Sequence, residues 1–447
     1  TTLFRSDVLM HVWYPTTIAT NSMVIRQRLT PLFEQSGTPD NVALAVNDFG
    51  LRGATSLESA KRGGAAHLLH FRGSDNMAAS AYFDSVYGVP GRALSVWATE
   101  HSVATSYGAD AGEFVYVHAQ LDRAPDDAIL SIVIDSYDAL NFVKNVIGSP
   151  EIKARIMARE GRIVLRPDSG DPLTIDLQVL DLLADIFGTT TNDKGYRVLQ
   201  HNVGIIQGDG MKADTIIALY EALMAAGWSA DNLVVGSGGG LLQEGFTRDT
   251  ARFAIKAAYA ETATGEHINI QKKPKTDASK ASKAGLLKVI RRDGQIVTVS
   301  QSEPGEDLLT TVYENGVFAP VDGQAIIQRA QLWGMILNYQ FKKASDITTD
   351  VTVEQLDIKA AAQAYRERDQ RDHKPKSEAS QALVGRGVQA LGTEAAIGKD
   401  ERKAKVLALF NAGMTSYIDL AFEMNLSEAT IQKYGKELGL TFIDTPY

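Results

Sequence analysis

The feature that most constrains the fold of this chain is a repeated pattern of short apolar runs, rich in β-branched residues, that end abruptly in glycine or charged residues. Continuous apolar runs of this length are typical of strands that are buried on both faces of a parallel sheet. The pattern predicts strands over residues 42–46, 66–71, 93–97, 131–134, 162–165, 203–206 and 232–235.

Helical patterns separate several of these runs. Within residues 213–228, helical spacing places Ile216, Leu219, Leu223 and Ala226 on one face. Alternating strands and helices predict an α/β fold with a parallel sheet or barrel. Because the active sites of α/β barrels lie just after the strands, the strand ends predict one large polar pocket lined by glycine.

The segment after the last predicted strand is rich in glycine, with Gly236, Gly238, Gly239 and Gly240. Backbone N–H groups in such a turn, together with the N-terminus of a following helix, can bind a phosphate that a Cβ atom would block. The alternative is a tight strand-to-helix connection without a ligand. The segments "RPDSGDP" (166–172) and "QGDG" (207–210) follow other predicted strands, and their placement favours the phosphate site.

Charged side chains also follow the predicted strands. Arg166 suits a phosphate or a polarised carbonyl, and Asp168 suits Mg²⁺ or a sugar hydroxyl. Asp135 and Asp209 hold matching positions after other strands, which favours Mg²⁺ with a phosphorylated sugar over zinc. The alternative is that each Asp only caps a helix. The Lys-rich segment 271–283 is either a solvated loop or a clamp for a polyanion.

Composition excludes several functional classes. The 447 residues contain no Cys, which excludes disulfides, thiolate catalysis and Cys-based zinc sites and indicates a reducing cytoplasm. The net charge of −9 disfavours a nucleic-acid partner. The sequence contains no apolar run long enough to span a bilayer and opens without a signal-peptide pattern. Its length allows two or three domains.

A series of motifs occurs in the order and at the spacing found in one enzyme family. They are "WYPTTIATNS", "NDFGLRG", "FRGSDN", "EHS", "DSYD", "RPDSGDP", "QGDG", "GSGGGLLQ" and "TRD". The Lys-rich segment from Lys272 to Gly285 follows them. From about residue 3 to about residue 335 the chain therefore resembles the nicotinamide phosphoribosyltransferases, which are type II phosphoribosyltransferases.

The resemblance implies a parallel, seven-stranded, barrel-like α/β domain, a smaller and partly β second domain, and a homodimer. It implies the reaction of nicotinamide with phosphoribosyl pyrophosphate to nicotinamide mononucleotide and pyrophosphate, a step of NAD salvage. Mg²⁺ would assist, and ATP would be a coupled co-substrate. The expected ranges are a non-barrel domain from 1–40 and 247–335, a catalytic barrel over 41–246, a helical linker over 336–400 and a helix-turn-helix-like module over 401–447.

The resemblance also implies roles for residues near the base and the leaving group. Phe49 would stack on the pyridine ring, and Arg52 would contact the ring region and the phosphates. Asp75 would accept a hydrogen bond from the carboxamide. His101 would be the phosphorylated residue, and Arg166 would lie between the base and the ribose phosphate.

The remaining implied residues would serve the metal, the ribose or the phosphates. Asp135 and Asp168 would hold Mg²⁺ and face the pyrophosphate. The other substrate-binding residues would be Gly208, Asp209, Gly238, Gly239, Arg248, Lys272 and Lys280.

Two regions depart from the family. Its N-terminal region, with a Tyr that stacks on nicotinamide across the dimer interface, is almost absent, so that either a companion chain supplies it, the sequence is a fragment, or the protein is impaired. At the other end, residues 401–447 predict three short helices with Thr415 and Ser427 as N-caps. DNA recognition by the helix from Ser427 is one interpretation. Residues 401–447 contain five Lys or Arg and six Asp or Glu, so they show no basic stripe, and a module that contacts a protein or packs on the chain itself is at least equally favoured.

Two alternatives to the nicotinamide enzyme stay open. One is a nicotinate phosphoribosyltransferase, although a carboxylate at Asp75 would meet the like charge of nicotinate. The other is a regulator whose barrel senses a nicotinamide nucleotide and whose C-terminal tail binds DNA or a partner.

Overall fold

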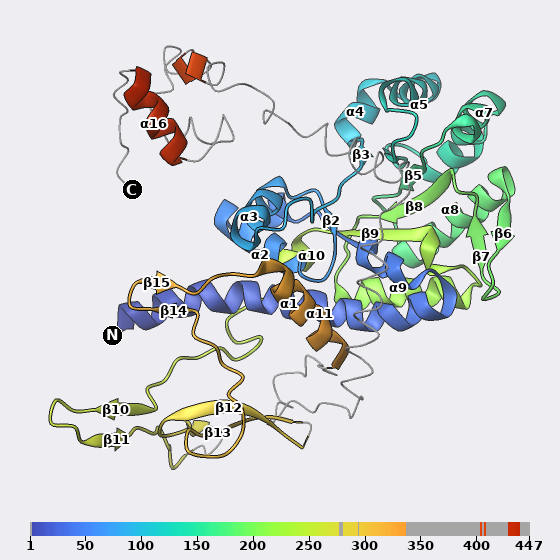
Figure 1. Ribbon diagram of the computed structural model, residues 1–447. Coiled ribbons are helices and arrows are strands. Elements are labelled where there is room, and N and C mark those ends of the chain that lie inside the picture. Colours follow the sequence, from blue (N-terminus) through green and yellow to red (C-terminus); the bar gives the residue numbers. More distant parts are fainter. Residues whose placement is uncertain are drawn as a thin grey trace. The chain divides into compact units, whose positions relative to one another are not determined.

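The computed structural model describes residues 2–276, 280–293, 295–336, 403–404, 406–407 and 428–438. The chain divides into two compact units, Thr1–Pro375 and Lys376–Tyr447. The first unit contains a large parallel sheet with helices around it, and small antiparallel hairpins that do not belong to that sheet (Figure 1). The finer domain boundaries within residues 1–335 stay predictions.

Seven strands form the parallel sheet. They are β1 (Val46–Asp48), β2 (Gly73–Ser74), β3 (Trp97–Ala98), β4 (Leu130–Val133), β5 (Ile163–Arg166), β8 (Val203–Gln207) and β9 (Leu233–Ser237). Their order in the sheet is β2-β1-β9-β8-β5-β4-β3, and every neighbouring pair is parallel. A separate hairpin, β6 (Thr189–Thr191) with β7 (Arg197–Leu199), lies in the chain between β5 and β8.

The two edges of this sheet also meet. Leu94, just before β3, forms a parallel bridge with Gly73 of β2. Its carbonyl accepts a hydrogen bond from the Ser74 N–H (2.9 Å), and its own N–H donates to the Arg72 carbonyl (2.7 Å). Since β3 pairs with β4 on its other side, the sheet curls round on itself. The predicted parallel, seven-stranded, barrel-like α/β domain is confirmed.

The strand positions were predicted correctly in the second half of the barrel only. β4, β5, β8 and β9 begin within one residue of the predicted runs. The prediction for 42–46 was wrong, because η1 (Pro39–Leu44) is a 3₁₀ helix and β1 starts at Val46. The prediction for 66–71 was also wrong, because α2 (Leu57–His67) continues into it. A buried helix and a buried strand both read as an apolar run.

Helices follow most of the strands, as the sequence pattern predicted. They are α2, α3 (Met77–Tyr87), α4 (His101–Ser106), α5 (Ala111–Arg123), α6 (Ala139–Asn141) with the π-helix η3 (Phe142–Ile147), α7 (Pro150–Ala158), α8 (Pro172–Phe187), α9 (Ala213–Ala225), η4 (Ala230–Asn232) and α10 (Gly239–Leu242). The prediction that Ala226 shares the buried face of α9 was wrong, because the helix ends before it. Gly227 (φ 81°) and the Trp228 N–H bond to the Leu223 carbonyl (3.1 Å) close that end.

One long helix, α1 (Thr2–Ser36), packs against α2, η1 and α9. It buries Ile18, Ile25, Leu29 and Phe33 at helical spacing. Lys194, from the β6–β7 hairpin, donates from Nζ to the carbonyls of Glu34 (2.7 Å) and Gly37 (2.6 Å). A lysine ammonium there satisfies carbonyls that the end of a helix leaves without an intrahelical donor.

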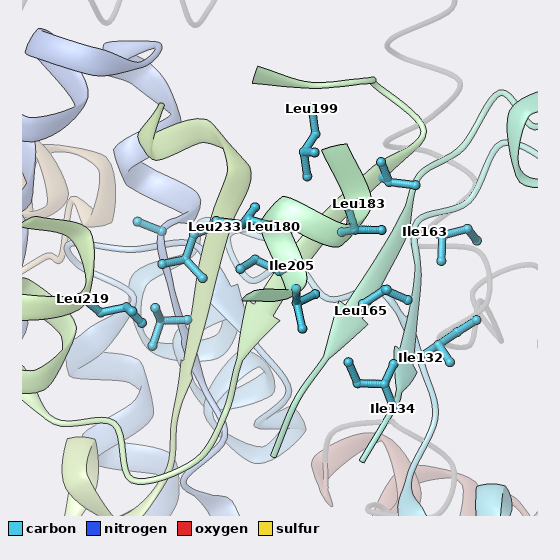
Figure 2. Close-up of a cluster of buried hydrophobic side chains, with 14 of the residues drawn as sticks. Ile132, Ile134, Ile163, Leu165, Leu180, Leu183, Leu199, Ile205, Leu219 and Leu233 are labelled. Atoms are coloured by element: carbon cyan, nitrogen blue, oxygen red, sulfur yellow. The ribbon is translucent and has the colours of Figure 1, made fainter. Parts of the chain in front are cut away.

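The main hydrophobic core lies between the strands and the surrounding helices. Figure 2 shows Ile163, Leu165 and Ile205 of the strands beside Leu180 and Leu183 of α8. All five side chains are at most 1% exposed. This dry, close-packed layer fixes the strand ends, and so it fixes the loops that follow them.

Three antiparallel hairpins occupy the segment after the barrel. They are β10–β11 (Tyr259–Glu261 and His267–Asn269), β12–β13 (Leu287–Arg292 and Gln295–Ser300) and β14–β15 (Tyr313–Glu314 and Val317–Phe318). The helix α11 (Gly323–Ile336) follows. The partly β character expected of this segment is confirmed.

In the second unit, the described residues include the helix α16 (Glu428–Leu438), where a helix from Ser427 was predicted. Lys403 forms an ion pair with Glu437, and Val406 and Tyr434 are buried. The predicted N-caps Thr415 and Ser427 lie outside the described residues, and a role in binding DNA or a partner stays a prediction. Of the helices that the structure describes, none is long and apolar enough to cross a membrane.

Candidate active site

The glycines after β9 do not all serve the same purpose. A Cβ on Gly236 would stand 1.9 Å from Cε2 of Phe49, and a Cβ on Gly240 would stand 2.4 Å from the Met211 carbonyl oxygen. These two glycines make room for the protein itself, so for them the alternative of a tight connection is correct. By contrast, among the described residues a Cβ on Gly239 would meet no atom within 4 Å, and one on Gly238 would meet only the Phe49 carbonyl group, with its oxygen at 3.5 Å. The backbone at Gly238 and Gly239 is therefore open to a ligand.

Phe49 follows β1 and lies at the centre of the strand ends. Its N–H donates to the Ser237 carbonyl (2.9 Å). Its ring lies against Gly236, and a Cβ on Gly208, after β8, would approach the same ring atom at 3.7 Å. The same Cβ would lie 3.1 Å from Oδ1 of Asp168. Phe49, Gly208 and Asp168, which the sequence placed in one site, are thus neighbours.

His101 lies between two of the predicted carboxylates. It is the first residue of α4, whose start is fixed by the Glu100 carboxylate accepting from the Ser102 N–H (2.8 Å). Its Nε2 lies 3.1 Å from Oδ1 of Asp135, and its Nδ1 lies 3.9 Å from Oδ2 of Asp168. The Asp135 side chain is only 6% exposed, whereas that of His101 is 34% exposed. The imidazole is therefore oriented by protein contacts while part of it stays accessible.

Arg166, at the end of β5, carries the positive charge of this cluster. It donates from Nη2 to the Thr99 carbonyl (3.3 Å), while its buried Nε has no hydrogen-bond partner among the described residues. A buried donor without a partner is costly, and an anionic ligand would satisfy it.

The pKa of Asp168 reflects the charged groups around it. Burial raises the pKa of Asp168, and the charges of Arg166 and His101 oppose this rise. The negative charges of Asp135 and Asp209 raise the same pKa further. Asp209 is therefore close enough to Asp168 to affect its pKa, and its binding of the ribose hydroxyls stays a prediction.

Asp75, after β2, lies within the electrostatic influence of the same arginine. Its Oδ1 accepts a hydrogen bond from the Ser95 hydroxyl (2.6 Å). Its surface is still accessible, but the protein atoms around it reduce its hydration and raise its pKa, against the effect of the Ser95 bond and of Arg166. A carboxylate held in this way can accept a further hydrogen bond from a ligand.

Four predicted residues are connected less directly to the site around Phe49 and His101. Arg52 is exposed in η2 (Leu51–Gly53), next to Gly53, on which a Cβ would lie 3.3 Å from the Gly239 nitrogen. Arg248 forms an ion pair with Asp249 and donates to the Phe253 carbonyl (2.8 Å). Lys272 and Lys280 lie between β11 and β12. Contact of these four residues with a substrate stays a prediction.

A magnesium ion is compatible with the carboxylates present. Among the described residues, no three His, Asp or Glu side chains form a candidate metal cage. Mg²⁺ does not require one, because it commonly binds one or two carboxylates together with substrate phosphates and water. Asp135 and Asp168, on either side of His101, supply such a pair.

Sequence reasoning missed the roles of several residues that shape this site. Gly236 accommodates the Phe49 ring, and Ser95 holds Asp75. Gln207 accepts a hydrogen bond at Oε1 from the Asp209 N–H (2.8 Å). Asp48 and Asn76 are hydrogen-bonded to each other beside the loops after β1 and β2, which carry Phe49 and Asp75 and are called the base-side loops below. Asp48, Asn76 and Gln207 directly adjoin predicted residues, so their polarity at strand ends was the available signal.

The chain is similar in sequence to known proteins. A model of the "Nicotinate phosphoribosyltransferase (NAPRTase) family" matches residues 44–317. A nicotinamide phosphoribosyltransferase of Xanthomonas campestris pv. campestris (strain 8004) is 39% identical over 323 residues, which are 70% of this chain and 68% of that protein. One of Acinetobacter baylyi (strain ATCC 33305 / BD413 / ADP1) is 33% identical over 330 residues, with 68% and 64% covered. The chain thus spans about two thirds of these relatives.

Among solved structures, the crystal structure of nicotinate-nucleotide pyrophosphorylase from Pyrococcus furiosus matches with a TM-score of 0.42 at 14% identity, covering 71% of each chain.

Proposed function

Because this chain belongs to the nicotinate phosphoribosyltransferase family, we propose that it joins nicotinamide to phosphoribosyl pyrophosphate and releases nicotinamide mononucleotide and pyrophosphate. Two matched relatives that carry the name nicotinamide phosphoribosyltransferase support this choice within the family. The observation that carries it is the carboxylate of Asp75, held by Ser95 at the strand ends near Phe49.

The two bases differ in charge at the group that Asp75 would face. The carboxamide of nicotinamide offers an N–H donor, and a hydrogen bond to a carboxylate is charge-assisted. Nicotinate would instead bring a second carboxylate against Asp75, and like charges repel strongly in a partly dehydrated site. Stacking on Phe49 suits both rings, so the discrimination is assigned to Asp75.

The chemistry is nucleophilic displacement at the ribose C1′ carbon. The pyridine nitrogen supplies the electron pair for the new bond, while the C1′–oxygen bond breaks and its electron pair leaves with pyrophosphate. Arg166, whose Nε has no partner among the described residues, would stabilise the departing negative charge. Asp209 would hold the ribose hydroxyls, and the N–H groups of Gly238 and Gly239 the 5′-phosphate. Such fixed groups supply orientation as well as charge.

Mg²⁺ would be held by Asp135 and Asp168 together with substrate phosphates, and its chemistry there is neutralisation of the pyrophosphate charge. ATP would phosphorylate His101, forming an N–P bond as ADP leaves. The partial exposure of His101 and its contact with Asp135 support this assignment. Arg52, Arg248, Lys272 and Lys280 would add positive charge around the phosphates.

We propose that the working form is a homodimer acting in the cytoplasm. A monodisperse sample of the purified chain that is monomeric and fully active would overturn the homodimer.

The matching family model is named after nicotinate phosphoribosyltransferase, so a nicotinate phosphoribosyltransferase is the second candidate. The test is to supply phosphoribosyl pyrophosphate with each base in turn and to quantify both mononucleotides by chromatography. A higher kcat/KM for nicotinamide is expected. A higher kcat/KM for nicotinate would favour the second candidate, and no product from either base would overturn the proposed function.

A further inference from the structure

We propose that Asp48 is a positioning residue that sets the choice of base by fixing Phe49 and Asp75 relative to each other. This inference rests on the proposed function. Asp48 is the last residue of β1, directly before Phe49, and is fully buried. No substrate contact is assigned to it, so its effect would pass through Phe49 and Asp75.

Three hydrogen bonds tie Asp48 to both base-side loops. Its Oδ1 accepts from the Gly50 N–H (2.7 Å), on the far side of Phe49. Its Oδ2 accepts from Nδ2 of Asn76 (3.0 Å), the residue after Asp75. Its main-chain carbonyl accepts from the Asp75 N–H itself (3.0 Å). One residue therefore fixes the backbone on both sides of Phe49 and at Asp75.

Asn76 anchors this connection to two helices. Its Nδ2 also donates to the Ala60 carbonyl of α2 (3.0 Å), and its Oδ1 accepts from the Ala79 N–H as the N-cap of α3 (3.0 Å). Gly64 of α2 lies over the bond, since a Cβ there would stand 2.5 Å from Oδ2 of Asp48 and 2.7 Å from Nδ2 of Asn76. The pair is thus enclosed by backbone.

A carboxylate suits this place better than an amide. Two donors, the Gly50 N–H and the Asn76 amide, point at the two oxygens of Asp48, and a carboxylate accepts at both. An asparagine has one oxygen, so its NH₂ group would face one of the donors. Burying a carboxylate is costly. If position 48 only filled the core, an apolar side chain would be enough. The carboxylate of Asp48 instead holds two loops.

The consequence for function is geometric. A misplacement of about 1 Å at a substrate-positioning group can reduce a rate by about a hundredfold. If the Asp48–Asn76 bond is lost, Phe49 and Asp75 are no longer fixed relative to each other. Nicotinamide, which needs both the ring and the carboxylate, should then suffer more than nicotinate, which gains nothing from Asp75.

The experiment exchanges the two side chains. Asp48→Asn should lower kcat/KM for nicotinamide by about tenfold or more, a change of about 1.4 kcal/mol, and reduce the nicotinamide-to-nicotinate ratio. In the double variant Asp48→Asn with Asn76→Asp, the new amide donates to the new carboxylate, the Gly50 N–H keeps an acceptor, and α3 keeps an N-cap. The Ala60 carbonyl loses the donor that Asn76 supplies and faces a carboxylate oxygen instead, so the exchange should restore the base ratio in part and not in full.

The matched control is Asp176→Asn. Asp176 is also fully buried, but its Oδ1 accepts from Gln207 (3.0 Å), away from the base-side loops. It should leave the base ratio unchanged. Calorimetric affinity for nicotinamide and thermal unfolding are measured for every variant. If Asp48→Asn does not fold, Asn76→Ser removes the same bond and retains an N-cap.

The outcomes separate this inference from the proposed function. A reduced ratio that the exchange raises again supports the positioning role. Equal losses for both bases, or a ratio that the exchange leaves as low as Asp48→Asn alone leaves it, would overturn it, because a structural role affects both bases alike. If the unmodified chain makes neither mononucleotide, the proposed function fails. Nicotinamide affinity across the variants then decides whether the inference fails with it.

Discussion

The ring of Phe49 lies directly against the α-carbon of Gly236, so that a Cβ on this glycine would stand 1.9 Å from the ring atom Cε2. The first glycine of the cluster after β9 therefore accommodates the protein's own aromatic ring. For Gly239, three residues further, no atom of the part of the chain that the structure describes lies within 4 Å of where a Cβ would be. Close packing explains one glycine, and an open approach for a ligand explains the other.

Valine should therefore have opposite effects at Gly239, where the space is open, and at Gly240, which like Gly236 packs against the protein. Gly239→Val should leave the thermal unfolding temperature close to that of the unmodified chain but weaken nicotinamide mononucleotide binding about tenfold or more, since the branched side chain would occupy the phosphate approach. Gly240→Val should instead destabilise the fold by about 1–3 kcal/mol, because its Cβ meets the Met211 carbonyl. Calorimetry and thermal unfolding check both. Normal binding by Gly239→Val would show that the loop is only a turn.

Asp75→Asn should shift the choice of base. The amide oxygen still accepts from Ser95, but the negative charge that repels nicotinate is gone. We expect the nicotinamide-to-nicotinate ratio of kcat/KM to fall by at least about tenfold. Asp84→Asn, on α3, is the control and should leave the ratio unchanged. Equal ratios for Asp75→Asn and the unmodified chain would refute the assignment.

His101→Ala should abolish ATP hydrolysis while leaving part of the ATP-independent synthesis. The reason is that the imidazole is the proposed acceptor of the γ-phosphoryl group. The measurement is acid-labile radiolabel from γ-labelled ATP on the protein. His118→Ala is the control. His118 lies on α5, where its Nδ1 is 2.7 Å from Nη1 of Arg155, and its loss should not affect labelling. Label that persists at full level in His101→Ala would contradict the role.

Asp176 should make the stability of the fold depend on pH. Burial raises the pKa of Asp176 to about 7, against the opposing effect of its bond to Gln207. An unfolded Asp has a pKa of about 3.9. Between these values the folded state keeps a proton that the unfolded state has lost, so this contribution is fully present below about pH 4 and is lost as the pH rises through about 7.

Urea unfolding at about pH 5 and about pH 8 measures this effect. At the higher pH the unmodified chain should be less stable than Asp176→Asn by on the order of a few kcal/mol, since one pKa unit corresponds to about 1.4 kcal/mol. At the lower pH the difference should shrink. A difference in unfolding free energy that is the same at both pH values would show that Asp176 titrates normally.

The sequence pattern by itself indicated a parallel α/β sheet or barrel and the acidic residues that follow its strands. The runs at 131–134, 162–165, 203–206 and 232–235 became β4, β5, β8 and β9, because burial on both faces leaves a continuous apolar signature. Asp135, Asp168 and Asp209 follow these strands, and parallel strands carry their ends to one side of the barrel. Local pattern and connectivity are enough for this much.

The tertiary structure alone decided which residues touch. The run at 42–46 is mostly a 3₁₀ helix, since an apolar run records burial and not backbone shape. Gly236 makes room for Phe49, and Asp48 is hydrogen-bonded to Asn76, because the strand order of the sheet places β1 between β9 and β2. The positions of Phe49 and Asp75 depend on these contacts between segments that are distant in sequence, and a single sequence does not show which distant segments touch.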